Sequence, residues 1–363
     1  MIRNIRLIFH VGFGKTATTW MQKQIFSNIA LNEKNCIYLG KLRDSGIMLD
    51  DRFNKLHYEL FSSLNRPKQY RGRNSTKLVN SYAKVISCKI TNKFNSINSK
   101  DWGNVIVSNE SIAGYGGYDA ELNLFLLKNV IEKIRVNLGD SFHLDEQILV
   151  TFREQASLLQ SHYAYDYYHL SGRFKTFDKF IEYGLNNHHN DIFGSLWIDE
   201  IIQFISDIFG KDSVMFVPYE LLKENEREFL IQTVVNLGIV PKTKINKYLN
   251  LKKENTNYKK EIKGNFIRDV SKITKLIVYL SKYSKFFPQT ILSFAKYIYI
   301  SIKKKQKTVI KGELVMTQKQ RESIRNLYSY SNSVASKMTS FDLGKLGYAV
   351  KKMEQYEVDQ SVQ

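Results

Sequence analysis

The sequence predicts a three-layer α/β fold, in which helices flank a central parallel sheet and a helical extension follows at the C-terminal end. Short apolar runs rich in branched and aromatic residues recur along the chain, as buried parallel strands require. Segments with apolar residues at helical spacing lie between these runs. A chain of 363 residues can also bury a large core around such a sheet.

The first strand and the loop after it organise the rest of the prediction. Ile5–Val11 is apolar throughout most of its length, and Gly12 and Gly14 mark its end. A helix is expected next, with Thr18 or Thr19 as its N-cap. Its apolar positions fall near helical spacing, at Trp20, Ile25, Phe26 and Ile29.

This loop is a candidate phosphate site. Backbone N–H groups at the helix start, the Lys15 ammonium and the hydroxyls of Thr16, Thr18 and Thr19 would converge on one anion. The nucleoside triphosphate motif GxxxxGK[ST] requires glycine where Phe9 stands, so the loop is P-loop-like rather than a true P-loop. The alternative is an ordinary glycine-containing turn from strand to helix.

The loop sequence GFGKTATTW resembles the 5′-phosphosulfate loop of sulfotransferases, and the chain is closest in style to bacterial carbohydrate sulfotransferases. Ala17 stands where that family usually has glycine, and it adds a Cβ where backbone approaches the phosphate. The resemblance implies 3′-phosphoadenosine 5′-phosphosulfate (PAPS) as donor and no metal ion. The donor-binding residues that it implies here are Gly12, Gly14, Lys15, Thr16, Ala17, Thr18, Thr19 and Trp20.

A short strand is expected at Asn35–Gly40, and helices and long loops at residues 41–100. A basic cluster in that segment could face an acidic substrate or form a solvated face: Arg66, Lys68, Arg71, Arg73 and Lys77. The next strong strand is Asn104–Ser108, and Glu110 follows it. Because ligands bind beyond the carboxyl ends of parallel strands, Glu110 is a candidate catalytic base. It could equally cap the next turn or pair with a lysine.

A third strand, Gln147–Phe152, ends at Arg153, and Ser161 lies eight residues later in a helix expected over Ala156–Tyr168. Sulfotransferases bind the 3′-phosphate of PAPS with an arginine at a strand end and a serine at this spacing, so the resemblance assigns that role to Arg153 and Ser161. Arginine suits the role because its planar fork of N–H donors matches phosphate oxygens.

The stretch SHYAYDYYHLSGRF, residues 161–174, is rich in aromatic side chains. These rings could line a saccharide cleft, or they could form the buried face of an amphipathic helix. His162 and His169 are second candidates for a catalytic base.

Further elements are predicted downstream. Helices are expected at Thr176–Tyr183, Leu196–Phe209 and Glu226–Ile239, and a fourth sheet strand at Ser213–Val217. The Val-Pro-Tyr-Glu-Leu sequence beginning at Val217 also resembles sulfotransferases, where it opens a helix late in the sheet. Lys252, Lys253 and Asn255 could supply a loop over the adenosine and 3′-phosphate, or form a solvated basic loop.

The predicted organisation is a catalytic domain at residues 1–258, a basic helical insertion at 259–316 and a C-terminal helix and tail at 317–363. Residues 259–311 contain 14 Lys and Arg against two acids, a net of +12, and their apolar residues recur at helical spacing around Pro288. Lysines interrupt every apolar run before bilayer-spanning length. Such helices could lie on an anionic membrane surface, or could pack on the catalytic domain.

Composition narrows the class of protein. The formal charge of +19 favours anionic partners, and two cysteines give no disulfide framework, which fits a reducing compartment. The chain opens on a strand without a leader peptide, so we expect a cytoplasmic enzyme, peripheral at the inner membrane face if the basic helices bind lipid. No metal-ligand spacing and no standard nucleic-acid motif is visible.

These observations predict a PAPS-dependent sulfotransferase acting on a hydroxyl or amine of a saccharide, such as a cell-surface glycan, a glycolipid or its precursor. The predicted catalytic residues are Lys15, which would stabilise the leaving oxygen, and Glu110. The alternatives are an atypical P-loop kinase that uses ATP, and a non-enzymatic basic protein that binds membranes or nucleic acid.

Overall fold

The computed structural model describes residues 2–40, 51–61, 75–96, 101–110, 112, 118–165, 173–174, 176–251 and 316–351. The chain divides into two compact units, Met1–Asn255 with Met316–Gln363, and Thr256–Val315. The second unit lies outside the described residues, as do Lys252, Lys253, Asn255, His169 and most of the basic cluster at residues 66–77. The predicted domain boundaries and the roles of these residues therefore stay predictions.

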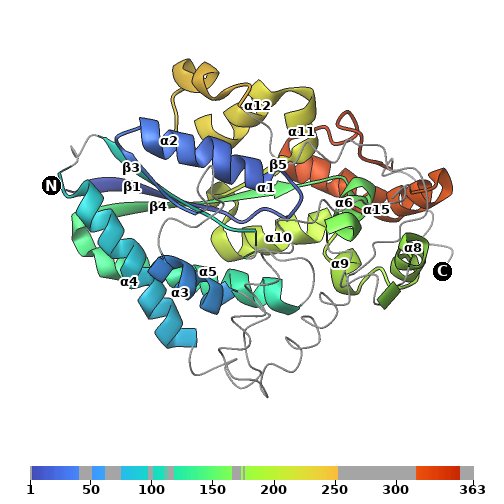
Figure 1. Cartoon of the computed structure of the whole chain (residues 1–363), viewed down its shortest axis with the longest axis horizontal. Helices are drawn as coiled ribbons and strands as arrows, with labels where there is room; N and C mark the ends of the chain where they lie inside the picture. Colours follow the sequence, from blue (N-terminus) through green and yellow to red (C-terminus); the bar gives the residue numbers. More distant parts are fainter. Residues whose placement is uncertain are drawn as a thin grey trace, which may run out of the picture. The chain divides into compact units, whose positions relative to one another are not determined.

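A five-stranded parallel sheet forms the centre of the first unit, in the order β2-β3-β1-β4-β5, which confirms the predicted α/β class (Figure 1). Its strands are β1 (Arg3–His10), β2 (Cys36–Leu39), β3 (Trp102–Ser108), β4 (Phe142–Phe152) and β5 (Val214–Pro218). All five were expected from their apolar runs. Their carboxyl ends meet at one edge of the sheet, where the candidate phosphate loop begins.

Strand β4 starts five residues earlier than the apolar run suggests. Its first half pairs with β1 in register, from Arg3 opposite Phe142. Phe142 and Leu144 are buried while His143 is exposed. This alternation is that of a strand with one face toward solvent, and it does not appear as a continuous apolar run.

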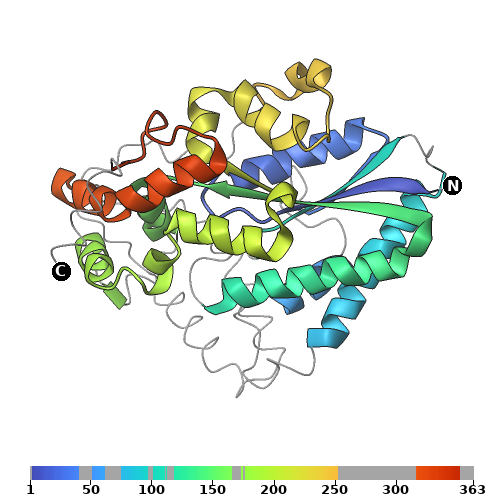
Figure 2. The same cartoon turned by 180° about the vertical axis from the view of Figure 1, so that it is seen from behind.

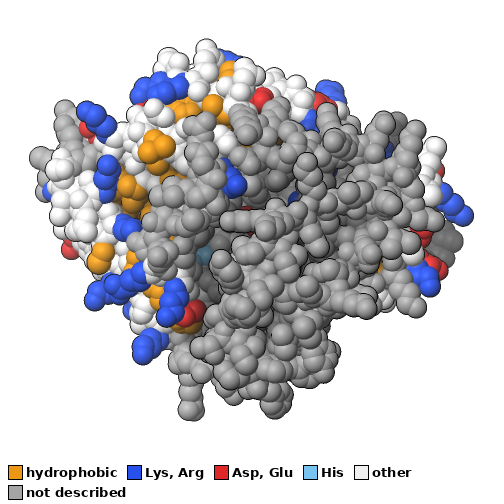
Figure 3. All heavy atoms as spheres, in the orientation of Figure 1, with side chains coloured by type: hydrophobic (Ala, Val, Ile, Leu, Met, Phe, Trp, Pro, Cys, Tyr) orange, Lys and Arg blue, Asp and Glu red, His pale blue; other side chains and the backbone are white. Residues whose placement is uncertain are grey.

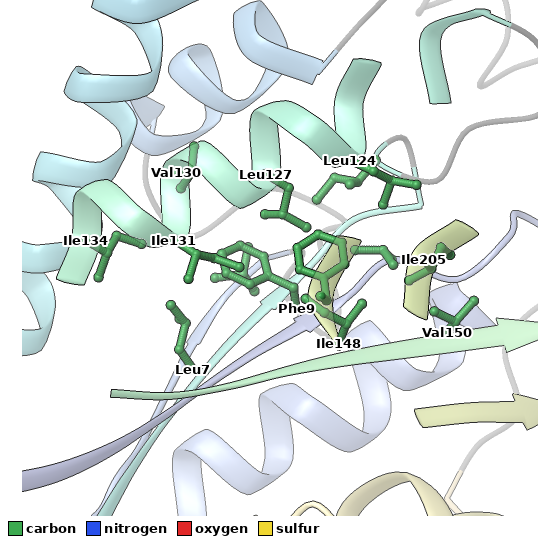
Figure 4. Close-up of a cluster of buried hydrophobic side chains, with 14 of the residues drawn as sticks. Leu7, Phe9, Leu124, Leu127, Val130, Ile131, Ile134, Ile148, Val150 and Ile205 are labelled. Atoms are coloured by element: carbon green, nitrogen blue, oxygen red, sulfur yellow. The ribbon is translucent and has the colours of Figure 1, made fainter. Parts of the chain in front are cut away.

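The two faces of the sheet have separate cores, which follow from the period-two alternation of β1. Ile5, Leu7 and Phe9 point to one face, which is covered by α3 (Asp51–Phe61), α4 (Ser75–Phe94), α5 (Tyr118–Leu138) and α10 (Ile198–Phe209). Figure 4 shows Phe9 and Ile148 among the leucines and isoleucines of α5, with Ile205 of α10 beside them.

Ile8 points to the opposite face, where the helix after the phosphate loop packs with the segment after β5 (Figures 1 and 2). That first helix runs through α1 (Thr18–Trp20), π-helical turns at Met21–Phe26 and α2 (Ser27–Asn32). The later elements on this face are α11 (Tyr219–Glu224), α12 (Glu226–Leu230), a second π-helical segment (Ile231–Val235) and a 3-10 segment (Lys242–Tyr248).

The remaining helices are close to their predicted positions, except the short helix at Asp191–Gly194, which like α5 had no counterpart in the prediction. They are α6 (Gln155–Tyr165), α8 (Phe177–Asn186), α9 (Asp191–Gly194) and α15 (Gln318–Thr339). Thr317 caps α15 through a capping box with Gln320, which explains why that helix begins where it does. The tail after α15 returns to the sheet and buries Tyr348 against Phe152.

Candidate functional site

The candidate phosphate loop continues along the sheet before it turns away. The N–H of Val11 donates to Leu149 O at 2.9 Å, and that of Phe13 donates to Thr151 O at 3.0 Å. Between them, Gly12 approaches β4 so closely that a Cβ there would lie 2.0 Å from Thr151 Oγ1. Gly12 is therefore required for packing of the loop on β4.

Two residues of the loop have left-handed backbone, Lys15 with φ 69° and Ala17 with φ 64°. Neither is glycine, so each carries strain of about 1 kcal/mol or more. The conformation of Ala17 gives a physical reason for the glycine that the sulfotransferase loop usually has there. It also bears on the helix start, because Ala17 is the N-cap residue of α1 and has no side-chain cap hydrogen bond. The predicted cap by Thr18 or Thr19 is wrong.

The side chain of Thr16 points into the protein. It is fully buried, its hydroxyl donates to Phe13 O, and its Oγ1 lies 2.8 Å from Thr151 Oγ1. Thr18 is also buried, and Thr19 is partly exposed. The Thr16 hydroxyl is thus occupied within the protein, and the backbone N–H is the group that this residue could offer a ligand.

Trp20 is 3% exposed and packs in the core on the Ile8 side of the sheet, with its ring 6.4 Å from that of Phe229. The described residues therefore enclose its indole. A contact of Trp20 with adenine stays a prediction.

Arg153 joins the two phosphate motifs that the sequence suggested. Its Nη1 donates to the backbone carbonyl of Lys15 at 2.9 Å, and its Nε donates to Ser157 Oγ at 3.0 Å. The guanidinium also lies 4.8 Å from the ring centre of Tyr219. These contacts fix the Arg153 side chain at the edge of the phosphate loop.

Ser157, one helical turn before Ser161, is a residue that sequence reasoning missed. Both serines lie on α6, four residues apart and so on one side of the helix, and Ser161 is partly buried. The signal for Ser157 was its position four residues after Arg153, at the start of a helix. A role for Ser161 stays a prediction.

Glu110 follows β3 at the same edge of the sheet. Gln22 Nε2 donates to Glu110 Oε2 at 2.9 Å. Burial lowers the pKa of Lys15, the nearby Arg153 lowers it further, and Glu110 raises it. Lys15, Arg153 and Glu110, which lie far apart in the sequence, are therefore close enough to interact electrostatically.

Three buried histidines lie near this site. Burial lowers the pKa of His10 to about 4, that of His57 to about 3 and that of His162 to about 4. Glu110 raises the pKa of His10 and His57, whereas Lys15 lowers that of His162. All three are uncharged at neutral pH, so His162 could accept a proton there only weakly.

The described part of the aromatic stretch 161–174 is packed inside the protein. Tyr163 is 1% exposed and its ring lies 5.1 Å from that of Phe177. Phe174 contacts Phe180 and Tyr183. For these residues the structure supports the buried aromatic face over the open saccharide cleft.

The C-terminal tail supplies a second buried contact close to Arg153. Tyr348 Oη donates to Glu220 Oε2 at 2.6 Å, and both residues are buried. Burial raises the pKa of Glu220, while Tyr348, Lys223 and Arg153 lower it. The Val-Pro-Tyr-Glu sequence therefore provides the Tyr219 ring against Arg153 and an anchor for the tail.

Lys and Arg side chains are spread over the described part of the face in Figure 3 and do not gather in one patch. Within the described ranges, no helix is both long and apolar enough to cross a bilayer. The same residues include no group of three or more side chains placed to hold a metal ion.

Comparison with known proteins gives a structural similarity. No family model matches the chain, and no curated protein matches it. The structure is similar to a sulfotransferase from Alicyclobacillus acidocaldarius, with a TM-score of 0.40 and 10% sequence identity, covering 93% of this chain and 97% of that one.

Proposed function

We propose that this chain is a sulfotransferase that moves the sulfuryl group of PAPS to a hydroxyl or amine. The observation that carries the proposal is the hydrogen bond from Arg153 to the Lys15 carbonyl. It joins the two segments whose sequences resemble the phosphate-binding motifs of sulfotransferases. Glu110, the third predicted group, influences the pKa of Lys15 from the end of the neighbouring strand.

The charges at the loop favour an anionic ligand. Burial disfavours the charge of Lys15, and the nearby Arg153 disfavours it further. A bound phosphate would relieve the repulsion and stabilise both charges. Among the described residues, no acceptor bonds Nη2 of Arg153, so the N–H groups on that nitrogen can bind the 3′-phosphate in this proposal.

The loop would hold the 5′-phosphosulfate through the backbone N–H groups after Gly14, with the Thr18 and Thr19 hydroxyls and the Lys15 ammonium. The acceptor oxygen attacks sulfur, the bond from sulfur to the 5′-phosphate oxygen breaks, and Lys15 stabilises the charge on that leaving oxygen. Preorganised donors of this kind supply a few kcal/mol each in the transition state. Glu110 takes the acceptor proton.

The acceptor in this proposal is a saccharide carried by a cell-surface glycan, a glycolipid or a precursor. The enzyme would work in a reducing compartment, because Cys36 and Cys88 are unpaired. In this proposal it works at the cytoplasmic face of the membrane. Transfer of labelled sulfate to a panel of glycans, glycolipids and phenols tests this part. Transfer to phenols alone would contradict it.

The donor is tested by calorimetric binding of 3′-phosphoadenosine 5′-phosphate (PAP), AMP and ATP. Wild type should bind PAP at least about tenfold more tightly than AMP, because a charge-assisted contact contributes about 1.5–3 kcal/mol. Arg153→Ala should reduce PAP affinity to that of AMP. Tighter binding of ATP than of PAP would favour the kinase and refute the proposal.

A matched control separates loss of the site from loss of an arginine. Arg173 also contacts aromatic rings, those of Phe174 and Tyr183, away from the loop. Arg173→Ala should leave PAP affinity unchanged. Equal losses in both variants would show that the assigned role of Arg153 is wrong.

A further inference from the structure

A continuous chain of buried side chains links the phosphate loop to Glu110. It passes through Thr16, Thr151, His10, Ser108 and Gln22, each of which is 2% exposed or less. The successive contacts are Thr16 Oγ1 to Thr151 Oγ1 at 2.8 Å, Thr151 Oγ1 to His10 Nε2 at 3.3 Å, His10 Nδ1 to Ser108 Oγ at 2.7 Å, Ser108 Oγ to Gln22 Nε2 at 3.2 Å, and Gln22 Nε2 to Glu110 Oε2 at 2.9 Å.

The Thr16 end of this series of hydrogen bonds, together with a neutral His10 ring, determines the donor in each contact. At one end, Thr16 donates its only hydroxyl proton to the Phe13 carbonyl, which can only accept. Thr16 must therefore accept from Thr151. The Thr151 proton is then used, so His10 Nε2–H must donate to Thr151.

The other end is compatible with the same direction. Gln22 Nε2 contacts both Ser108 and the Glu110 carboxylate, so its two N–H groups donate to these two oxygens. The remaining nitrogen of His10, Nδ1, carries no proton in the neutral ring and accepts from the Ser108 hydroxyl. Three protons thus serve the three middle contacts, with none left over.

We propose that His10 and Gln22 are positioning residues, through which the phosphate loop and the catalytic base are held in one arrangement. This inference rests on the proposed function, because it assigns Glu110 as the base. Gln22 stabilises the carboxylate form of Glu110 and orients it, and Ser108 fixes the Gln22 amide. His10 accepts from Ser108 and donates to Thr151, which in turn donates to Thr16. The His10 ring must be neutral and protonated on Nε2 for this series of hydrogen bonds to form.

Burial supports this protonation state. The fully buried His10 ring has its pKa lowered to about 4, so it carries a single proton at neutral pH. A protonated ring would place a second donor opposite Ser108, which already accepts from Gln22. Ser108 would then have to accept twice and turn its own proton to another partner, so the sequence of donors given above is that of the uncharged imidazole.

The first test uses wild-type protein with ¹⁵N-labelled histidine, and His10→Gln identifies the His10 signals. NMR at pH 7 should show a neutral His10 with its proton on Nε2. In Ser108→Ala, which removes the donor to Nδ1, this preference should weaken toward a mixture of tautomers. A proton on Nδ1 in wild type, or a charged ring, would overturn the inference.

The second test follows the Glu110 carboxyl carbon by NMR as pH changes, in wild type and Gln22→Met. Loss of one charge-assisted N–H donor should raise the pKa of Glu110 by about one pH unit. Lys15, His10 and His57 are titratable groups of the described residues that interact with Glu110, and all are retained in this variant. Ser87→Ala, which removes another buried hydroxyl within α4, is the control and should leave the Glu110 titration unchanged.

Kinetics complete the test if wild type transfers sulfate. Gln22→Met should lower kcat about tenfold or more and move the acid limb of its pH profile upward, with little change in KM for PAPS. If PAP does not bind but both NMR results hold, the proposed function fails and the hydrogen-bonded chain stands. If PAP binds but the Glu110 titration is unchanged, the inference fails and the proposed function stands.

Discussion

The close approach of Gly12 to β4 gives a strong prediction. In Gly12→Ala, the new Cβ would lie 2.0 Å from Thr151 Oγ1 and 2.9 Å from the Thr151 backbone nitrogen. Ordinary contact begins near 3.4 Å, so the hydroxyl contact alone requires a movement of 1.4 Å, the difference between 3.4 and 2.0 Å. The backbone atom belongs to a central strand and cannot move independently of the sheet.

Overpacking in a rigid core costs about 1–3 kcal/mol, and contact with backbone places Gly12→Ala at the upper end, about 3 kcal/mol. The melting temperature should fall by about 4 °C, because the unfolding entropy of a chain of this length is large. Urea unfolding monitored by circular dichroism measures the change in free energy. Because the loop must shift away from β4, PAP affinity should fall as well.

A double-mutant cycle tests the cause. Thr151→Ala removes the atom at 2.0 Å but leaves the backbone nitrogen at 2.9 Å, so it should rescue part of the loss, with a coupling of about 1 kcal/mol. Gly139→Ala is the control, because its φ is +56° and no atom lies within 4 Å of the new Cβ. It should cost only about 1 kcal/mol, from backbone strain. Equal losses at the two glycines, without coupling to Thr151, would refute the packing argument.

Three further variants test strain and buried charge by urea unfolding. Ala17→Gly should raise stability by about 0.5 kcal/mol, because relief of left-handed strain of about 1–2 kcal/mol exceeds the entropy that glycine adds to the unfolded chain; a loss of stability would contradict it. Tyr348→Phe should cost about 1–3 kcal/mol, and more at pH 7 than at pH 5. Burial raises the pKa of Glu220 above 4.5, and the Tyr348 hydroxyl opposes that rise. Without the hydroxyl, the folded chain holds the proton to a higher pH than the unfolded chain, so stability falls as pH rises above 4.5. A pH-independent loss would show that Glu220 does not titrate in this way. His57, whose pKa burial lowers from 6.5 to about 3, should contribute to loss of stability as pH falls from 6.5 toward 3, because only the unfolded chain takes up its proton. His57→Phe should reduce that slope by about one proton between pH 6 and 4, and an unchanged slope would place the acid sensitivity elsewhere.

The sheet was predictable because its strands are locally encoded. The apolar runs at Ile5, Asn104 and Gln147 need no partner to be recognised, since a strand buried on both faces must be apolar along its length. The amphipathic half of β4 and the whole of α5 were missed. In the first case polar residues alternate with Phe142 and Leu144. In the second the helix begins directly after Gly114, Gly116 and Gly117, which indicate a turn rather than a helix.

Part of the site was predictable for the same reason. Lys15 and Arg153 stand at strand ends, where parallel topology brings side chains together whatever the details of packing. Ser157 could have been considered beside Ser161, but the contact that selects it depends on the direction of the Arg153 side chain. The described core buries the indole of Trp20, and the expected contact of that residue with the ligand stays a prediction.

The sequence by itself determined the parallel α/β sheet, the glycine-bounded loop after its first strand and the presence of Lys15, Glu110 and Arg153 at the strand ends, because these features depend on local patterns and on topology. Only the tertiary structure decided that Thr16 points inward, that Gly12 lies against Thr151 and that His10, Ser108 and Gln22 form one hydrogen-bonded chain. The physical reason is that the direction of a buried hydrogen bond depends on which other groups share its donors and acceptors, and those groups come from strands and helices far apart in the chain.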